Sequence, residues 1–355
     1  MIPVWKLKRE LARIGQQLRI PISFTWAIVG KYLYERNKHR HVRLSAGKIA
    51  CHPDIAIVLI YQPIGLQASL FETCRHLVSH GISPFIVSNA PLQEHDRNRL
   101  LERSYLIMER PNFGYDFGGY RDGILHLLDS GIFPSNLLVM NDSIWFPTLD
   151  KTDLIATIRN QDNDLFGPVF NDRLKNKKLS HLQSYMFNFK HRVLYDPAFR
   201  RYWERLVVSG NKQLVVRLCE MRMTRKLQDL GFSLGYIWTA EDGIKAMKML
   251  HASQLSAALD YIGSTQPKIA ARITSLRQLR MGEAEILDTV TGSYSTAPYL
   301  LKLPAWLLID MLGLPFLKKD RSYPYRKQRI DFLQTPPKLQ INSIIQAEII
   351  RWDQI

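Results

Sequence analysis

The chain has 355 residues, of which 46% are hydrophobic and 23% are charged. This composition is ordinary for a globular protein, and the length allows one large domain with appendages or two domains. The three cysteines lie far apart, which excludes the usual zinc-site spacings and a disulfide framework and favours a reducing cytoplasm. The net charge of +16 indicates a polyanionic partner: nucleic acid, an anionic membrane surface or a phosphate-bearing substrate.

The first 50 residues carry much of this charge, with eleven Lys or Arg residues against two Glu residues. Apolar residues recur at three- and four-residue spacing over residues 2–20 and predict a basic amphipathic helix. This helix either packs on the domain or lies in an anionic membrane interface. Residues 26–29 are apolar but too short to span a membrane, and no secretory signal is evident. Residues 36–48 are interpreted as a linker.

From residue 53 onward, short apolar runs alternate with amphipathic stretches. Strands are predicted at residues 55–61, 84–88, 105–108, 137–140, 165–170 and 185–190, and helices at 67–80, 92–102, 119–130 and 197–208. Such alternation is typical of an α/β fold with a mostly parallel sheet. Residues 211–280 are mainly helical, with another helical patch at 304–311. We therefore predict an N-terminal segment (1–50), a ligand-binding core (51–210) and a mainly helical C-terminal region (211–355).

The predicted strand at 137–140 ends on Asn141, Asp142 and Ser143. Open α/β sheets bind ligands at the carboxyl ends of their strands. A carboxylate there can hold Mg²⁺ or Mn²⁺, which neutralises the charge of a leaving diphosphate. The alternative is an N-cap or an Asx-turn, because all three residue types are common in turns.

A second polar cluster, residues 112–119, precedes a predicted helix. Its glycines, Gly114 and Gly118 among them, permit close backbone approach to a ligand, and Asp116 can accept a hydrogen bond from one. The spacing differs from GxGxxG, and the cluster lacks the Lys of a P-loop. A plain turn before a helix is the alternative interpretation.

Two further sets of residues are candidates for binding or catalysis. On a strand, His181 and Gln183 would share one face beside Ser184 and could bind acceptor hydroxyls, and His181 could serve as a base or metal ligand. Glu220 lies in a predicted helix and could accept a proton from an acceptor hydroxyl. The alternatives are a structural histidine and a helix-surface partner of the neighbouring arginines.

Residues 55–320 resemble the rhamnan synthesis protein F family of bacterial polysaccharide glycosyltransferases. Six elements carry the resemblance in the same order: Asn112-x-Gly-Tyr-Asp-Phe-Gly118, Asn141-Asp-Ser143 with Pro147, Phe166-Gly167 followed by His181-Leu-Gln-Ser-Tyr185, Phe199 with Trp203, Glu220 with Leu227 and Gly231, and Gly313-x-Pro-Phe-x-Lys318. Phe146, where a Gly often precedes the Pro, and the basic loop 171–180 depart from the pattern. Because the loop lies on the acceptor side, the resemblance alone does not identify the acceptor or the sugar.

The resemblance implies a GT-A-like, Rossmann-type fold and transfer of a sugar from a nucleotide donor, often dTDP-rhamnose, to a growing glycan. It implies donor-binding roles for Asn112, Gly114, Asp116, Gly118, Asn141, Asp142 and Ser143, with Asp142 also holding Mg²⁺ or Mn²⁺. It implies acceptor-binding roles for Gln183 and Ser184, and catalytic roles for Glu220 and His181.

We interpret the chain as an inverting glycosyltransferase that acts on a lipid-linked cell-surface polysaccharide such as O-antigen, capsule or rhamnan. The resemblance implies that it is a rhamnosyltransferase. Its basic N-terminal helix and the basic region Lys318–Lys327 would hold it on the inner face of the cytoplasmic membrane. A non-catalytic glycan-binding or assembly component with the same fold is the alternative. Nucleic acid is not an expected partner, because no nucleic-acid-binding motif is present.

Overall fold

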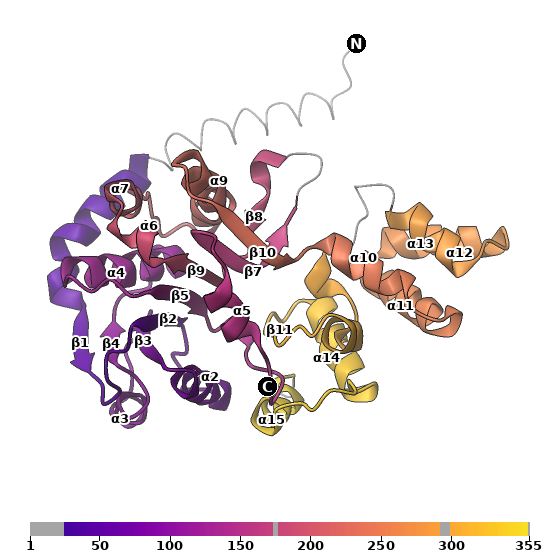
Figure 1. Cartoon of the computed structure of the whole chain (residues 1–355), viewed down its shortest axis with the longest axis horizontal. Coiled ribbons are helices and arrows are strands. Elements are labelled where there is room, and N and C mark those ends of the chain that lie inside the picture. Colours follow the sequence, from indigo (N-terminus) through magenta and orange to yellow (C-terminus); the bar gives the residue numbers. More distant parts are fainter. Residues whose placement is uncertain (1–24, 173–176, 292–298, 354–355) are drawn as a thin grey trace, which may run out of the picture.

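The computed structural model describes residues 25–172, 177–291 and 299–353 (Figure 1). The amphipathic helix predicted at residues 2–20 lies outside these ranges. A helix covers residues 25–41 at the start of the described chain. Within the described ranges, no helix combines the length and apolar character needed to cross a bilayer.

A nine-stranded sheet forms the centre of the molecule. Its strands are β1 (Arg43–Ala46), β2 (Asp54–Ile60), β3 (Ile82–Ser88), β4 (Leu106–Glu109), β5 (Asn136–Asn141), β7 (Leu165–Asn171), β8 (His181–Leu182), β9 (Met186–Lys190) and β10 (Leu234–Trp238). The order is β1-β4-β3-β2-β5-β9-β7-β10, and β8 pairs with β7. Strands β4, β3, β2 and β5 are mutually parallel, whereas β9 runs antiparallel between β5 and β7. The predicted fold class, an α/β fold with a mostly parallel Rossmann-type sheet, is confirmed.

Helices cover both faces of the sheet (Figure 1). One face carries α4 (Tyr115–Asp129), α6 (His191–Tyr195), α7 (Pro197–Arg205), α8 (Lys212–Val215) and α9 (Met221–Asp229), whereas the other carries α2 (Ala68–Ser79), α3 (Glu94–Leu101) and α5 (Leu154–Asn160). Each side has its own apolar core. Because β2 and β3 are buried along their whole length, their continuous apolar sequence is that of strands covered on both faces.

The C-terminal part forms a helical lobe and then returns to the sheet (Figure 1). The lobe comprises α10 (Ala240–Lys248), α11 (Ala252–Thr265), α12 (Pro267–Gln278) and α13 (Glu283–Thr291). The returning chain contains the turns Leu300–Lys302 and Leu307–Met311, β11 (Leu317–Lys318), α14 (Tyr323–Gln334) and α15 (Ser343–Trp352). Strand β11 pairs antiparallel with β6 (Ile144–Trp145), directly after β5. This pairing brings Lys318 to the carboxyl end of the central strands.

Two predictions about the chain's organisation need correction. Residues 36–48 are not a linker, because the first helix continues to residue 41 and β1 pairs with β4. The sheet also extends past residue 210, because β10 pairs in parallel with β7. The two edge strands of the sheet, β1 and β10, depend on contacts between segments distant in sequence. Local composition does not reveal such contacts.

Asp122 of α4 anchors the helix of residues 25–41. Its carboxylate accepts hydrogen bonds from Tyr34 Oη at 2.5 Å, Lys38 Nζ at 3.0 Å and Arg110 Nε at 2.7 Å, and Arg121 Nη1 lies 3.3 Å away. Burial opposes its ionisation, but the charges of Arg110 and Lys38 hold its pKa below the ordinary value. The anchor therefore stabilises the fold at neutral pH and weakens as pH falls through that lowered pKa.

Replacing Asp122 with Ala is expected to lower the free energy of unfolding by about 3–5 kcal/mol, because Arg110, whose side chain is fully buried, loses its carboxylate partner. Denaturant unfolding measures the change. Asp129→Ala on the same helix is the matched control, since the pair of Asp129 with Arg200 is exposed and worth less than about 1 kcal/mol. Equal losses in the two variants would contradict the assignment.

Candidate functional site

The candidate site lies where β2 and β5 end. Strand β2 leads to β3 on one side, whereas β5 joins it on the other, so this is the topological switch point at which open α/β sheets bind ligands. Asp142 follows β5 directly, and its backbone N–H donates to the Leu59 carbonyl of β2 at 3.0 Å. The polar residues after β5 thus stand beside the end of β2.

The Asp142 carboxylate is held by the residues that follow β2 rather than by its own turn. Its Oδ2 accepts hydrogen bonds from the Tyr61 backbone N–H and from Gln62 Nε2, each at 3.0 Å. The Asx-turn alternative instead applies to Asn141, whose Oδ1 accepts from the Ser143 backbone N–H at 3.1 Å and the Ser143 hydroxyl at 2.6 Å. Asp142 is therefore held at the strand tip and is only partly buried.

The glycines of the 112–118 element shape the start of α4. Gly114 is the N-cap residue with a φ of 80°, which favours glycine. A Cβ on Gly118 would lie 2.0 Å from the Phe113 carbonyl oxygen. This tight turn starts α4 at Tyr115, four residues earlier than predicted, and places Asp116 in its first turn. The side-chain oxygen of Asn112 is buried without a hydrogen-bond partner among the described residues.

Asp116 joins the residues after β5 through its side chain. Its Oδ2 accepts a hydrogen bond from Asn141 Nδ2 at 2.9 Å. Burial, followed by the negative charges of Asp142 and Glu220, raises the pKa of Asp116 to about 6. The predicted donor residues and Glu220 thus form one electrostatic unit, which we call the carboxylate cluster (Asp116, Asp142 and Glu220).

Lys318 of β11 supplies positive charge to the carboxylate cluster. Its Nζ donates to the Ser143 hydroxyl at 3.3 Å and lies 4.2 Å from the ring centroid of Tyr185. Burial lowers the pKa of Lys318 to about 8, while Glu220 and Asp116 oppose the shift. Between about pH 6 and about pH 8, an ionised Asp116 therefore faces a protonated Lys318. Perturbed pKa values of this kind are frequent at functional sites.

Glu220 belongs to the cluster although it lies much later in the sequence than Asp116 and Asp142. It is the last residue of a π-helical turn (Val216–Glu220) that precedes α9, and such turns are frequent at functional sites. Its charge raises the pKa of Asp116 and opposes the lowering at Lys318. Glu220 is partly exposed, so its carboxylate is accessible to a ligand.

Asp116→Asn is expected to stabilise the protein above pH 6. Because the pKa of Asp116 is raised in the folded state, its stabilising contribution is complete below the unfolded value and is lost as pH rises through about 6. An amide keeps the shape without this charge, so the melting temperature should rise by about 2 °C at about pH 8 and stay unchanged at about pH 4. Thermal melts at both pH values measure the difference, with Asp129→Asn as the control. A variant that melts like the wild type at both would contradict this electrostatic account.

The residues present suit a shared cation site better than an all-protein one. Among the described residues, no three His, Cys, Asp or Glu side chains are placed to bind a metal ion. Mg²⁺, however, is commonly bound by one or two carboxylates together with substrate phosphates. Asp142, beside an Asp116 whose pKa is raised by burial and then by neighbouring negative charge, fits that arrangement.

Residues 181–184, predicted to contact a ligand, form several hydrogen bonds within the protein. His181 is 3% exposed, and its Nδ1 lies 2.7 Å from the Leu179 carbonyl oxygen. Strand β8 ends at Leu182, but the pairing with β7 continues, because the Gln183 backbone N–H donates to the Val169 carbonyl oxygen at 3.0 Å. Gln183 Oε1 accepts a hydrogen bond from the Tyr299 hydroxyl, and the Ser184 carbonyl accepts one from Tyr120 at 2.8 Å.

Lys318 is the site residue whose position the sequence interpretation missed. Within the basic region Lys318–Lys327, which was predicted to face a membrane, Lys318 and Lys319 instead point into the protein. Lys319 is 8% exposed and lies 3.3 Å from Glu348 Oε1. The motif from Gly313 to Lys318 that carries the family resemblance was the available signal in the sequence. Its position beside Ser143 depends on the pairing of β11 with β6, which is a long-range contact.

Comparison with known proteins places the chain in a family. The family described as "Rhamnan synthesis protein F" matches residues 84–275, more than half of the chain. The uncharacterized protein y4gN of Sinorhizobium fredii is 36% identical over 358 residues, covering 100% of this chain and 93% of that protein.

Two solved structures show weaker similarity. The glycosyltransferase GlyE of Streptococcus pneumoniae TIGR4 has 10% identity and a TM-score of 0.32, covering 52% of this chain and 45% of that one. The mannosyltransferase PcManGT of Pyrobaculum calidifontis, in complex with GDP-Man and Mn²⁺, has 10% identity and a TM-score of 0.34, covering 94% and 88%. The assignment therefore depends on the family match, and the chain belongs to the rhamnan synthesis protein F family.

Proposed function

We propose that this protein is a glycosyltransferase that moves a sugar from a nucleoside-diphosphate donor to a growing polysaccharide. The observation that carries the proposal is the convergence of Asp116, Asp142, Glu220 and Lys318 at the switch point of the sheet. These residues come from four separate sequence elements. Membership of the rhamnan synthesis protein F family supports a role in polysaccharide synthesis.

The proposed donor side comprises the start of α4 and the end of β5. Asn112, with its unpartnered buried oxygen, and Asp116 would contact the nucleoside or the sugar. Lys318 would face the diphosphate, whose negative charge increases as the sugar leaves. A fixed positive charge in a partly buried site stabilises such developing charge.

The proposed reaction is a direct displacement with inversion. An acceptor hydroxyl oxygen forms a bond to the anomeric carbon as the bond to the diphosphate oxygen breaks, and Glu220 takes the hydroxyl proton. Glu220 is partly exposed, whereas His181 is buried against the Leu179 carbonyl. This contrast favours Glu220 as the base and a positioning role for His181.

Asp142 is the proposed residue for a divalent cation shared with the donor diphosphate. Bound Mg²⁺ or Mn²⁺ would supply additional positive charge against the departing nucleotide. The carboxylate is already oriented by Tyr61 and Gln62, so little reorganisation is needed when a cation and a diphosphate arrive together.

The donor and acceptor can be proposed in more detail from the family. Its description as a rhamnan synthesis family supports rhamnose as the sugar and dTDP-rhamnose as a donor. We further propose a lipid-linked cell-surface polysaccharide as the acceptor, met at the inner face of the cytoplasmic membrane.

A turnover assay with purified protein tests this function. The protein is incubated with single nucleotide sugars, including dTDP-rhamnose, in the presence of bacterial lipid-linked glycan extract, and nucleoside-diphosphate release is measured. Release that depends on one donor and on the extract supports the proposal. Glycan binding without release from any donor would favour a non-catalytic assembly component.

A further inference from the structure

The helix of residues 25–41 is attached to the protein through its polar side chains. Tyr34 and Lys38 bind Asp122 at 2.5 and 3.0 Å, and Glu35 pairs with Arg121. Lys31 donates a hydrogen bond to the Glu204 carbonyl oxygen at the end of α7. The face that contacts the fold is thus largely polar and charged.

The opposite face of the same helix is apolar and exposed. The exposed fractions are 69% for Trp26, 48% for Ile28, 40% for Val29, 64% for Tyr32 and 51% for Leu33. Surface helices of globular proteins normally have the reverse arrangement, with the apolar face toward the core. A contiguous exposed apolar patch of this kind marks an interaction surface.

The positive charges beside the apolar patch favour an anionic lipid surface as its partner. The outward positions that follow the patch are the exposed Arg36 and Arg40, and the exposed Arg43 begins β1 two residues after the helix ends. Trp and Tyr are enriched where protein meets the membrane–water boundary, and nearby Lys and Arg are attracted to anionic lipids. A second copy of the chain would bring an equally basic surface, so charge favours lipid over self-association.

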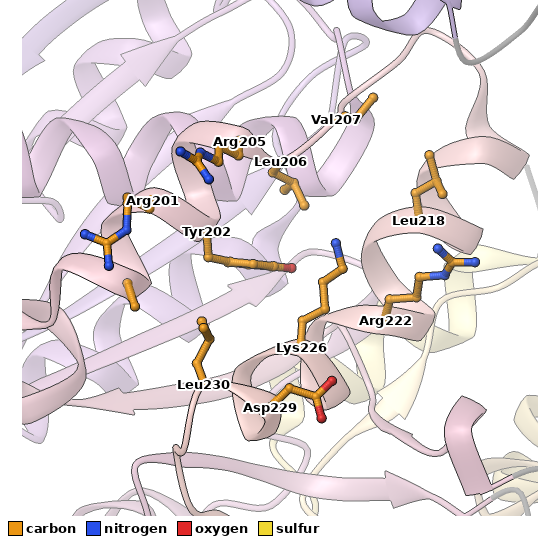
Figure 2. Close-up of a pocket in the computed structure, with 11 residues that line it drawn as sticks. Arg201, Tyr202, Arg205, Leu206, Val207, Leu218, Arg222, Lys226, Asp229 and Leu230 are labelled. Carbon is orange, nitrogen blue, oxygen red and sulfur yellow. The ribbon is translucent and has the colours of Figure 1, made fainter. Parts of the chain in front are cut away.

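A basic pocket lies between α7 and α9. Figure 2 shows its cations Arg201, Arg205, Arg222 and Lys226 around apolar side chains that include Leu206. The pocket has a volume of about 490 Å³. The salt bridges among described residues include none of these four cations.

The same pocket contains a polar group without a partner. The Tyr202 hydroxyl is buried and forms no hydrogen bond with a described residue. Helix α7, which carries Tyr202, is also the helix that Lys31 contacts through Glu204. Figure 1 shows α7 and α9 on the side of the sheet that α4 covers. The cations of this pocket could bind the phosphate of a lipid, and its apolar side chains could contact the first part of the hydrocarbon chain.

We propose that the outward face of helix 25–41 inserts into an anionic membrane interface, while the pocket between α7 and α9 binds lipid phosphate. This inference adds a defined docking surface to the proposed function. Its test requires neither sugar donor nor acceptor, so lipid binding and glycosyl transfer can succeed or fail separately.

The experiment is co-sedimentation of the full chain with phosphatidylcholine vesicles, with and without phosphatidylglycerol. The wild type is expected to bind the anionic vesicles preferentially. Combined Trp26→Ser, Tyr32→Ser and Leu33→Ser substitutions should weaken this binding at least about tenfold. The matched control replaces Ile64, Met249 and Leu279 with Ser, since these side chains are 73–95% exposed elsewhere on the surface, and should bind like the wild type.

A second variant tests the pocket. Combined Arg201→Gln, Arg205→Gln and Arg222→Gln substitutions should reduce binding to anionic vesicles and leave binding to neutral vesicles unchanged. The proposal is overturned if the wild type does not bind anionic vesicles. It is overturned as well if the variant with Trp26, Tyr32 and Leu33 replaced by Ser binds them like the control. It is also overturned if light scattering shows a dimer that the apolar-face substitutions convert to a monomer.

Discussion

Asp142→Asn is expected to lower the rate of glycosyl transfer by roughly 10²–10³-fold without unfolding the protein. The amide keeps the size of the side chain and can still accept the Tyr61 and Gln62 hydrogen bonds. It loses the negative charge proposed to hold a divalent cation against the donor diphosphate. Asp142→Ala, which also removes the acceptor atoms, is expected to abolish transfer.

Nucleoside-diphosphate release measures the rate, and circular dichroism confirms that each variant is folded. Asp150→Asn is the control, because Asp150 is an exposed carboxylate on the segment after β6. Full activity in a folded Asp142→Asn protein would remove the centre of the proposed donor site.

The second large effect is expected at Glu220. Glu220→Gln should lower kcat by about 10²–10⁴-fold, because an amide cannot accept the proton of the acceptor hydroxyl. Donor affinity should change little, since Asp142 and the start of α4 remain intact. The raised pKa of Asp116 should also fall toward its ordinary value, because Glu220 contributes to the shift.

His181→Asn is the matched comparison for Glu220→Gln. His181 is fixed against the Leu179 carbonyl, so its replacement is expected to affect stability more than kcat. Steady-state kinetics together with thermal melts separate the two effects. A large loss of kcat in the histidine variant, with normal kcat in the glutamate variant, would reverse the assigned roles.

The sequence predicted the elements that depend on local pattern. Apolar runs such as residues 55–61 became buried central strands, because continuous apolar sequence suits a strand covered on both faces. The start of α4 was missed by four residues, because the tight turn at Gly114 and Gly118 permits an earlier start than helix propensity suggests.

The rest of the candidate site depends on contacts across long sequence distances. The structure places the predicted residues Asp116, Asp142 and Glu220 in one cluster, although their roles stay predictions. Lys318 was predicted at a membrane surface, whereas β11 brings it to Ser143. Residues 36–48 were interpreted as a linker because they are polar and basic, whereas in the structure Lys38 pairs with the distant Asp122.

The most direct test of the central claim is calorimetric titration of the protein with several nucleoside diphosphates, with and without Mg²⁺ or Mn²⁺. We expect metal-dependent binding of one nucleotide to the wild type and the loss of this binding in Asp142→Ala. Absence of binding by any nucleotide to the folded wild type would contradict a donor site at the end of β5.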